Sequence, residues 1–161
     1  MLLRDLVKYN CISNKELSDF YGSVNTLTSK FNNDLYKLKK KKISKNIFLK
    51  KYGHLRPSTY SITSKNYNDG FDVYFSNIKN IKLNKTKKFE LHSSKENLIN
   101  KLLKKNNIKF DAKKLFGFAK LAIYEREYSK YIFTKAVNEI FANLKYLSSE
   151  LKINYTDFEY L

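Results

Sequence analysis

The scarcity of residues that interrupt helices is the strongest constraint on the fold of this chain. Its 161 residues include only four glycines and one proline, the residue types that most often mark turns and end helices. The chain is 42% hydrophobic and 16% aromatic, which is enough to form a core. The sequence therefore predicts a mainly α-helical fold, and its length fits a single helical domain over residues 1–161.

Two capping patterns predict where helices begin. Ser13 with Glu16, and Ser93 with Glu96, have the spacing of a capping box. In that motif, each of the two side chains bonds the other residue's backbone N–H. Each pair therefore predicts a helix start.

Apolar periodicity predicts two further helices in the first third of the chain. Steps of three and four between apolar residues predict a helix beginning near residue 23 and ending in lysines that suit the helix dipole. A shorter helix is expected from about Ser44, with Ile47, Phe48 and Tyr52 pointing inward. Gly53 follows, where a left-handed helix cap is expected.

A long helix is predicted from Asp111 to about Leu151. Arg126 and Ser129 are expected on its buried face, where a charge needs partners. The small residues near Arg126 leave room for another backbone or a ligand. The predicted apolar stripe consists of Leu115, Phe118, Ala122, Arg126, Ser129, Phe133, Val137, Ile140, Leu144, Leu147 and Leu151.

The segment from about residue 54 to 92 lacks helical periodicity. It contains Pro57, the turn signal Asn68-Asp69-Gly70 and scattered aromatic residues, which predict an ordered loop held by large side chains. Its basic part, residues 79–88, is expected to be a mobile surface excursion. The complete prediction is a helical bundle with one long C-terminal helix and an irregular inserted loop.

The chain is strongly basic, and its basic residues are nearly all lysine. Its net charge is +17, a balance typical of proteins that bind nucleic acid or anionic surfaces. Arginine occurs only at positions 4, 56 and 126, although its planar fork suits phosphate better than lysine does. We therefore interpret the lysine run near residue 40 as a solvated helix end, with a nucleic-acid patch as the alternative.

The sequence holds no familiar catalytic or metal-binding motif. Walker loops, glycine-rich dinucleotide turns and zinc-type Cys/His clusters are absent. Cys11 has no charged neighbour to activate it and is interpreted as a packed small hydrophobe. No apolar run could span a membrane and no cleavable signal begins the chain, so a cytoplasmic location is expected. We expect no catalytic residue, no metal site and no cofactor within this chain.

Residues 52–60 (YGHLRPSTY) carry the densest group of unusual residues. Within five positions the segment holds Gly53, His54, Arg56 and the single proline, Pro57. Proline restrains the residue before it to an extended backbone, so the arginine side chain is expected to have a fixed direction. Two interpretations stay open here: His54 and Arg56 contact a ligand, or they bond within the protein and lock a rigid loop.

The same segment resembles a known family. YGHLRPSTYSI, preceded by FLKK at residues 48–51, is similar to the FLxxYGHLRPGTYDI motif of phosphoenolpyruvate-synthase-like proteins, relatives of pyruvate phosphate dikinase. Rifampicin phosphotransferases carry a looser version. Residues 126–134 (REYSKYIFT) resemble the family's REYxKFxFT helix. The chain departs from the first motif at Ser58, where the family has glycine, and at Ser61, where it has aspartate. A positive φ at Ser58 would strain the loop, and the aspartate lost at 61 could leave Arg56 less firmly held.

The resemblance implies the central helical region of an ATP-dependent phosphotransferase. In that family an ATP-grasp domain precedes this region and a phosphohistidine domain follows it. ATP and Mg are implied only for the whole enzyme, and His54 is not the phosphorylated histidine. The chain is then expected to be a fragment or split subunit that shapes the acceptor side for a small anionic substrate, with the other domains supplied in trans. The residues expected to position substrate or lock the loop are His54, Arg56, Thr59, Tyr60, Arg126, Glu127 and Lys130.

Two alternatives to this function stay open. A small basic nucleic-acid-binding protein would gather lysines on one face and bind with steep salt dependence. A structural remnant without ligand would be affected by loss of Arg56 only through stability.

Overall fold

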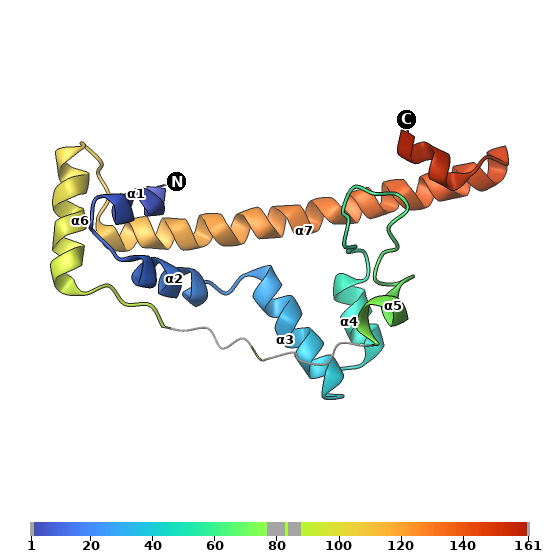
Figure 1. The fold of residues 1–161 in the computed structure, drawn as a ribbon, viewed down its shortest axis with the longest axis horizontal. Helices are drawn as coiled ribbons and strands as arrows, with labels where there is room; N and C mark the ends of the chain where they lie inside the picture. Colours follow the sequence, from blue (N-terminus) through green and yellow to red (C-terminus); the bar gives the residue numbers. More distant parts are fainter. Residues whose placement is uncertain (1, 77–82, 84–87, 161) are drawn as a thin grey trace. The chain divides into compact units, whose positions relative to one another are not determined.

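The chain is mainly helical over residues 2–76, 83 and 88–160, which are the residues its computed structural model describes. The predicted fold class is therefore confirmed, and these residues include no β-strand. The basic stretch 79–88 lies mostly outside the described residues. The helices in Figure 1 are α1 (Leu2–Lys8), α2 (Asn14–Ser23), α3 (Leu27–Lys39), α4 (Lys45–Tyr52), α5 (Phe71–Phe75), α6 (Ser93–Lys105), α7 (Ala112–Leu151) and the 3₁₀ helix η1 (Tyr155–Tyr160).

The chain divides into two compact units, which are described separately. The first unit contains residues 1–27 and 85–126, and the second contains residues 28–84 and 127–161. One boundary falls at the start of α3 and the other within α7, so a single continuous helix belongs to both units. That all 161 residues form one domain stays a prediction.

Aromatic and aliphatic side chains form the core of the first unit. Phe20 and Ile99 are completely buried. Phe20 packs edge-on against Phe89 and Phe116, with ring centroids 5.3 and 5.1 Å away. Cys11, predicted to pack as a small hydrophobe, is a free thiol buried in this core. Burial of one such aromatic side chain contributes about 2–3 kcal/mol of stability.

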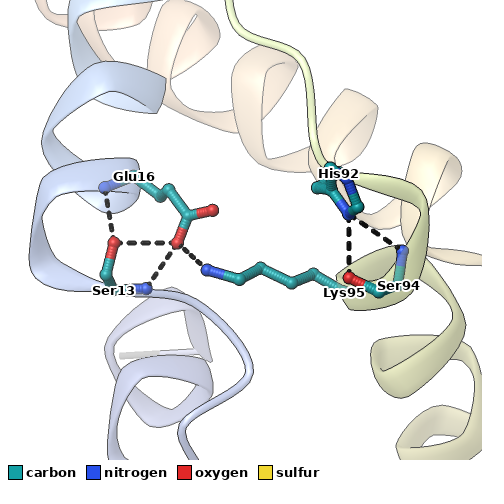
Figure 2. A network of polar contacts seen from close by, with 5 residues as sticks. All are labelled: Ser13, Glu16, His92, Ser94 and Lys95. Atoms are coloured by element: carbon teal, nitrogen blue, oxygen red, sulfur yellow. Dashed lines mark hydrogen bonds and ion pairs between the residues drawn. The ribbon is translucent and has the colours of Figure 1, made fainter.

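A polar network links α2 to α6 (Figure 2). The Ser13 hydroxyl accepts the Glu16 N–H at 3.2 Å, and the Glu16 carboxylate accepts the Ser13 N–H at 2.8 Å. The first predicted capping box is therefore confirmed. Lys95 on α6 donates to the same carboxylate at 2.5 Å. The bonds from Lys95 and Ser13 lower the pKa of Glu16 to about 2.

The second predicted capping box is wrong, although α6 begins where it predicted. The N-cap is His92, whose Nδ1 accepts the Ser94 N–H at 3.4 Å. Glu96 pairs instead with Lys113 on α7 at 3.7 Å. An imidazole nitrogen thus takes the place that a hydroxyl usually occupies at a helix start.

An aromatic cluster forms the core of the second unit. Phe48 is completely buried and Tyr52 is 5% exposed, as predicted. Ile47 is 51% exposed, so the prediction that it points inward is wrong. Phe31 of α3 packs edge-on against Tyr52, with centroids 5.0 Å apart. Phe75 of α5 packs edge-on against Phe48 at 5.6 Å. Each such pair contributes about 0.5–1.5 kcal/mol beyond its buried area.

The starts of α3 and α4 differ in how well the sequence predicted them. The first, α3, begins at Leu27 rather than near residue 23, because α2 continues to Ser23 and Val24 ends it in an extended conformation. The second, α4, begins as predicted, with the Ser44 hydroxyl accepting the Ile47 N–H at 3.2 Å.

The long helix α7 has the predicted extent but does not bury the whole predicted stripe. Asp111 caps its start by accepting the Lys114 N–H at 2.7 Å. Arg126 and Ser129, predicted to be buried, are exposed. A helix of 40 residues spans roughly 60 Å, and an apolar stripe over that length would need packing partners at every turn. Of the predicted stripe, Leu115 and Val137 are buried, whereas Phe118, Phe133, Ile140, Leu147 and Leu151 are exposed.

Among the described residues, no helix combines the length and the apolar character that crossing a bilayer requires.

Candidate functional site

The segment 52–60 starts at a helix end that a buried carboxylate fixes. Asp34 of α3 is 8% exposed, and its Oδ2 accepts the Tyr52 hydroxyl at 3.1 Å and Lys51 Nζ at 2.9 Å. Lys37 donates to the other oxygen at 3.2 Å. Burial raises the pKa of Asp34, but the hydrogen bonds outweigh it and the pKa is lowered. Burial and this carboxylate raise the pKa of the Tyr52 phenol. No prediction from the sequence included Asp34.

Gly53 follows α4, but it is not the left-handed cap that the sequence predicted. Its φ is −59°, in the right-handed helical region. Glycine is needed here for a different reason, because an added Cβ would meet the Asn68 side chain and the Leu49 carbonyl. The Asn68 N–H donates to the Gly53 carbonyl at 3.1 Å. Close approach of the returning loop, rather than backbone conformation, therefore selects glycine at this position.

His54 packs against the long helix. Its ring lies edge-on to Tyr131 with centroids 4.8 Å apart, and the Tyr131 hydroxyl donates to the Lys51 carbonyl at 2.6 Å. Nε2 of His54 is buried and hydrogen bonds to no described residue. Burial lowers the pKa of His54, a bond to the Tyr131 backbone opposes this, and the charge of Lys135 lowers it further. A neutral imidazole is therefore the favoured form at this position.

Arg56 is held by α7 about two to three turns beyond Tyr131. Its Nη2 donates to Asn138 Oδ1 at 2.8 Å, and Nη1 donates to the Ser61 carbonyl at 3.4 Å. Its Cζ lies 4.6 Å from the centroid of the Phe141 ring. Burial lowers the pKa of the Arg56 guanidinium, whereas Tyr155 and nearby acidic groups raise it. The side chain is thus fixed by a hydrogen bond and a ring face on the same helix.

The two departures from the family motif are accommodated without strain. Ser58 does not adopt a positive φ, so the expected cost of replacing glycine does not arise. Ser61 lacks a carboxylate of its own, but its hydroxyl donates to Glu159 of η1 at 2.7 Å. Thr63 donates to the same carboxylate at 3.1 Å. An acidic group therefore reaches position 61 from the C-terminal 3₁₀ helix.

A cavity of about 330 Å³ lies beside Arg56 in the second unit. Tyr155 lines it and donates its hydroxyl to the Ile62 carbonyl at 2.8 Å. Its cationic lining groups outnumber its one acidic group, which favours an anionic ligand. The polar lining residues are Arg56, Thr63, Ser64, Lys65, Asn66, Asp69, Asn138, Lys145, Tyr155 and Thr156.

The other predicted site residues lie apart from this cavity's lining. Glu127 accepts the Thr28 N–H at 3.2 Å, at the start of α3, and Lys130 is exposed. Tyr60 is 71% exposed, with its ring 6.4 Å from that of Phe133. Thr59, also predicted, is only partly buried and is not part of the cavity lining.

Arg126 belongs to the first unit, whereas His54 and Arg56 belong to the second. The contacts of His54 and Arg56 with α7 are made at Tyr131, Asn138 and Phe141.

The positive groups on the wall of this cavity have the chemistry to bind and orient an anion. Arg56 has five N–H donors, of which two bond to Asn138 and Ser61, so others can serve a ligand. Among the described residues no group of His, Cys, Asp and Glu could hold a metal ion. Comparison with protein-family models, curated proteins and solved structures gives no match.

Proposed function

We propose that the second unit forms the acceptor side of a phosphotransferase similar to phosphoenolpyruvate synthase. In this proposal the chain is a fragment or split subunit and does not catalyse phosphoryl transfer alone. An ATP-grasp domain and a phosphohistidine domain act in trans, and ATP and Mg bind there. The single observation that supports this function best is that Arg56, the arginine of the motif, lines a cavity that also has Lys65 and Lys145 on its wall.

The proposed ligand is a small anion, such as a short phosphorylated acid. The cavity of about 330 Å³ is at the lower end of the size of small-molecule sites. Fixed positive groups bind an anion with little loss of side-chain freedom. Arg56 meets this condition because Asn138 and Phe141 already hold its guanidinium.

His54 has a different proposed role, because it does not line this cavity. Its ring packs on Tyr131, whose hydroxyl bonds the end of α4. We assign His54 to locking the loop, so that Arg56 keeps its direction. Thr59, Tyr60, Glu127 and Lys130 do not line the cavity, and Arg126 belongs to the other unit, so the proposal gives none of them a part in binding.

Titration of ¹⁵N-labelled protein with phosphoenolpyruvate as the probe tests the proposal. Saturable shifts are expected at Asn66 and Asn138, near the cavity. Lys145→Gln should weaken binding by up to about fivefold, the effect of one partly exposed charge. Lys130→Gln is the matched control, since this lysine is also exposed on α7 but does not line the cavity.

Two results would reject the proposal. One is the absence of saturable shifts at millimolar probe, and the other is equal weakening by both lysine variants. Tight RNA binding that falls steeply with salt would favour the nucleic-acid alternative instead. ATP-dependent phosphorylation by the purified chain would contradict the statement that it is not catalytic alone.

A further inference from the structure

A second cavity, of about 500 Å³, lies within the first unit, and the proposed function does not use it. Its volume is within the usual range of small-molecule sites, roughly 300–1,000 Å³. One wall comes from the segment before α6 and the other from the first turns of α7. The lining residues are Phe89, Glu90, Leu91, Glu96, Ala112, Lys113, Phe116, Gly117 and Lys120.

The floor of this cavity is apolar and aromatic. Phe116 is 7% exposed and Ala112 is 1% exposed. The Phe116 and Phe89 rings are 5.3 Å apart at their centroids and 42° apart in plane. Phe20 packs edge-on against both rings and so restricts their movement. Such a floor favours a flat ring, which can pack on the aromatic faces.

Gly117 leaves the α7 wall of the cavity without a side chain. Glycine inside a helix costs about 1 kcal/mol relative to alanine, so its presence at this point needs a reason. Close packing does not supply one, because an added Cβ would meet no heavy atom within 4 Å. What glycine does supply here is free volume along the cavity.

The charged groups on the rim leave one lysine available for an anion. Glu96 pairs with Lys113 at 3.7 Å, and Glu90 pairs with Lys88 at 2.5 Å. Lys120 forms no ion pair with a described residue, and its Nζ lies 5.9 Å from the centroid of the Phe20 ring. The net charge of +17 also favours anions over cations near this surface.

We propose that this cavity binds a small, flat, mainly apolar molecule that carries one carboxylate. The ring of the ligand lies against Phe89 and Phe116, in the space that Gly117 leaves open. The carboxylate lies toward Lys120 at the rim. Binding is non-covalent and needs no co-reactant.

The experiment is an NMR titration of the whole ¹⁵N-labelled chain with 2-naphthoate. Saturable shifts are expected at Leu91, Phe116 and Gly117. Gly117→Leu fills the cavity and should weaken binding more than tenfold. Gly22→Leu is the matched control, because Gly22 is also a helical glycine whose added Cβ would meet nothing within 4 Å, yet it does not line the cavity.

The charge preference is tested with Lys120→Gln and with two related probes. Loss of one partly exposed lysine should weaken the binding of 2-naphthoate by up to about fivefold. Naphthylmethylammonium and 2-naphthalenemethanol should bind more weakly than 2-naphthoate. If Gly117→Leu loses its helical circular dichroism, Gly117→Ala and Lys120→Gln carry the test. The inference is overturned by the absence of saturable shifts, by equal binding to the two leucine variants, or by equal binding of the ammonium probe.

Discussion

Replacing Arg56 by lysine tests whether geometry, and not charge alone, holds the loop on α7. Lysine keeps the positive charge but loses the planar fork. The bond to Asn138 at 2.8 Å and the contact with the Phe141 ring at 4.6 Å both depend on that fork. A hydrogen bond with a charged partner contributes about 1.5–3 kcal/mol, and a partly exposed cation–π contact about 0.5–1 kcal/mol. Because lysine can recover part of the hydrogen-bond energy, we expect a loss of about 2 kcal/mol in the free energy of unfolding.

Urea denaturation followed at amide signals of the second unit measures this loss. A double-mutant cycle with Asn138→Ala isolates the pair, and its coupling energy should be about 1 kcal/mol. Arg126→Lys is the control, because this arginine is exposed on the same helix and surface changes usually cost less than about 0.5 kcal/mol. Equal small losses for both arginine variants, or a coupling energy near zero, would refute the reasoning.

Three further perturbations have expected outcomes. The pKa of His54 is lowered by burial, so the unfolded chain binds its proton first as pH falls below about 6.5. Stability should then fall as the pH drops below about 6.5, by up to about 1.4 kcal/mol per pH unit, and His54→Gln should flatten that slope in pH-dependent urea midpoints. Gly53→Ala should cost about 1–3 kcal/mol through overpacking, and Asn68→Gly in the same chain should restore part of it; no recovery would contradict the proposed clash. The pKa of Glu16 is about 2, so its contribution is present above its ordinary pKa and is lost as pH falls from about 4.5 toward 2. Lys95→Gln should reduce that acid sensitivity, and an unchanged NMR titration of Glu16 would contradict it.

The helix ends were the most predictable part of the fold, because local chemistry determines them. Ser13, Ser44 and Asp111 each offer an oxygen to an N–H near a helix start. A helix start was predicted from the sequence at each of the three. The cap at His92 was missed because histidine rarely takes that position. Residue types that strongly prefer helix starts therefore predicted where helices begin, whereas the unusual histidine cap was not predicted.

Which residues are buried was less predictable, because burial depends on neighbours distant in the sequence. Periodicity gave α7 a single apolar stripe, yet Arg126 and Ser129 on that stripe are exposed. Asp34 shows the opposite error: it is buried, although a carboxylate is usually expected at the surface. One signal could have found it: Asp34 lies three residues after Phe31 and four before Leu38, on the apolar face of α3.

The segment 52–60 was predictable as a centre, but its partners were not. The sequence pointed to α7 as the supporting helix, but to Arg126, Glu127 and Lys130 on it, although the resembling stretch runs over residues 126–134 and includes Tyr131. The contacts fall instead on Tyr131, Asn138 and Phe141. A neutral amide and aromatic rings recur throughout this chain, so their residue types alone do not mark them as partners of Arg56.

His54 and Arg56 are two positions apart in the chain but have opposite electrostatic requirements. His54 lies against the Tyr131 ring with its Nε2 buried and unbonded among the described residues, an environment that opposes a charge. Arg56 keeps its charge, because a guanidinium is not deprotonated in proteins, and it lines a cavity with two lysines. An anion in that cavity would be attracted by the charge of Arg56. It would not contact His54, which does not line the cavity. If a neutral His54 keeps the loop in place, the direction of Arg56 depends on it, so protonation of the histidine should weaken anion binding even though the histidine does not touch the anion.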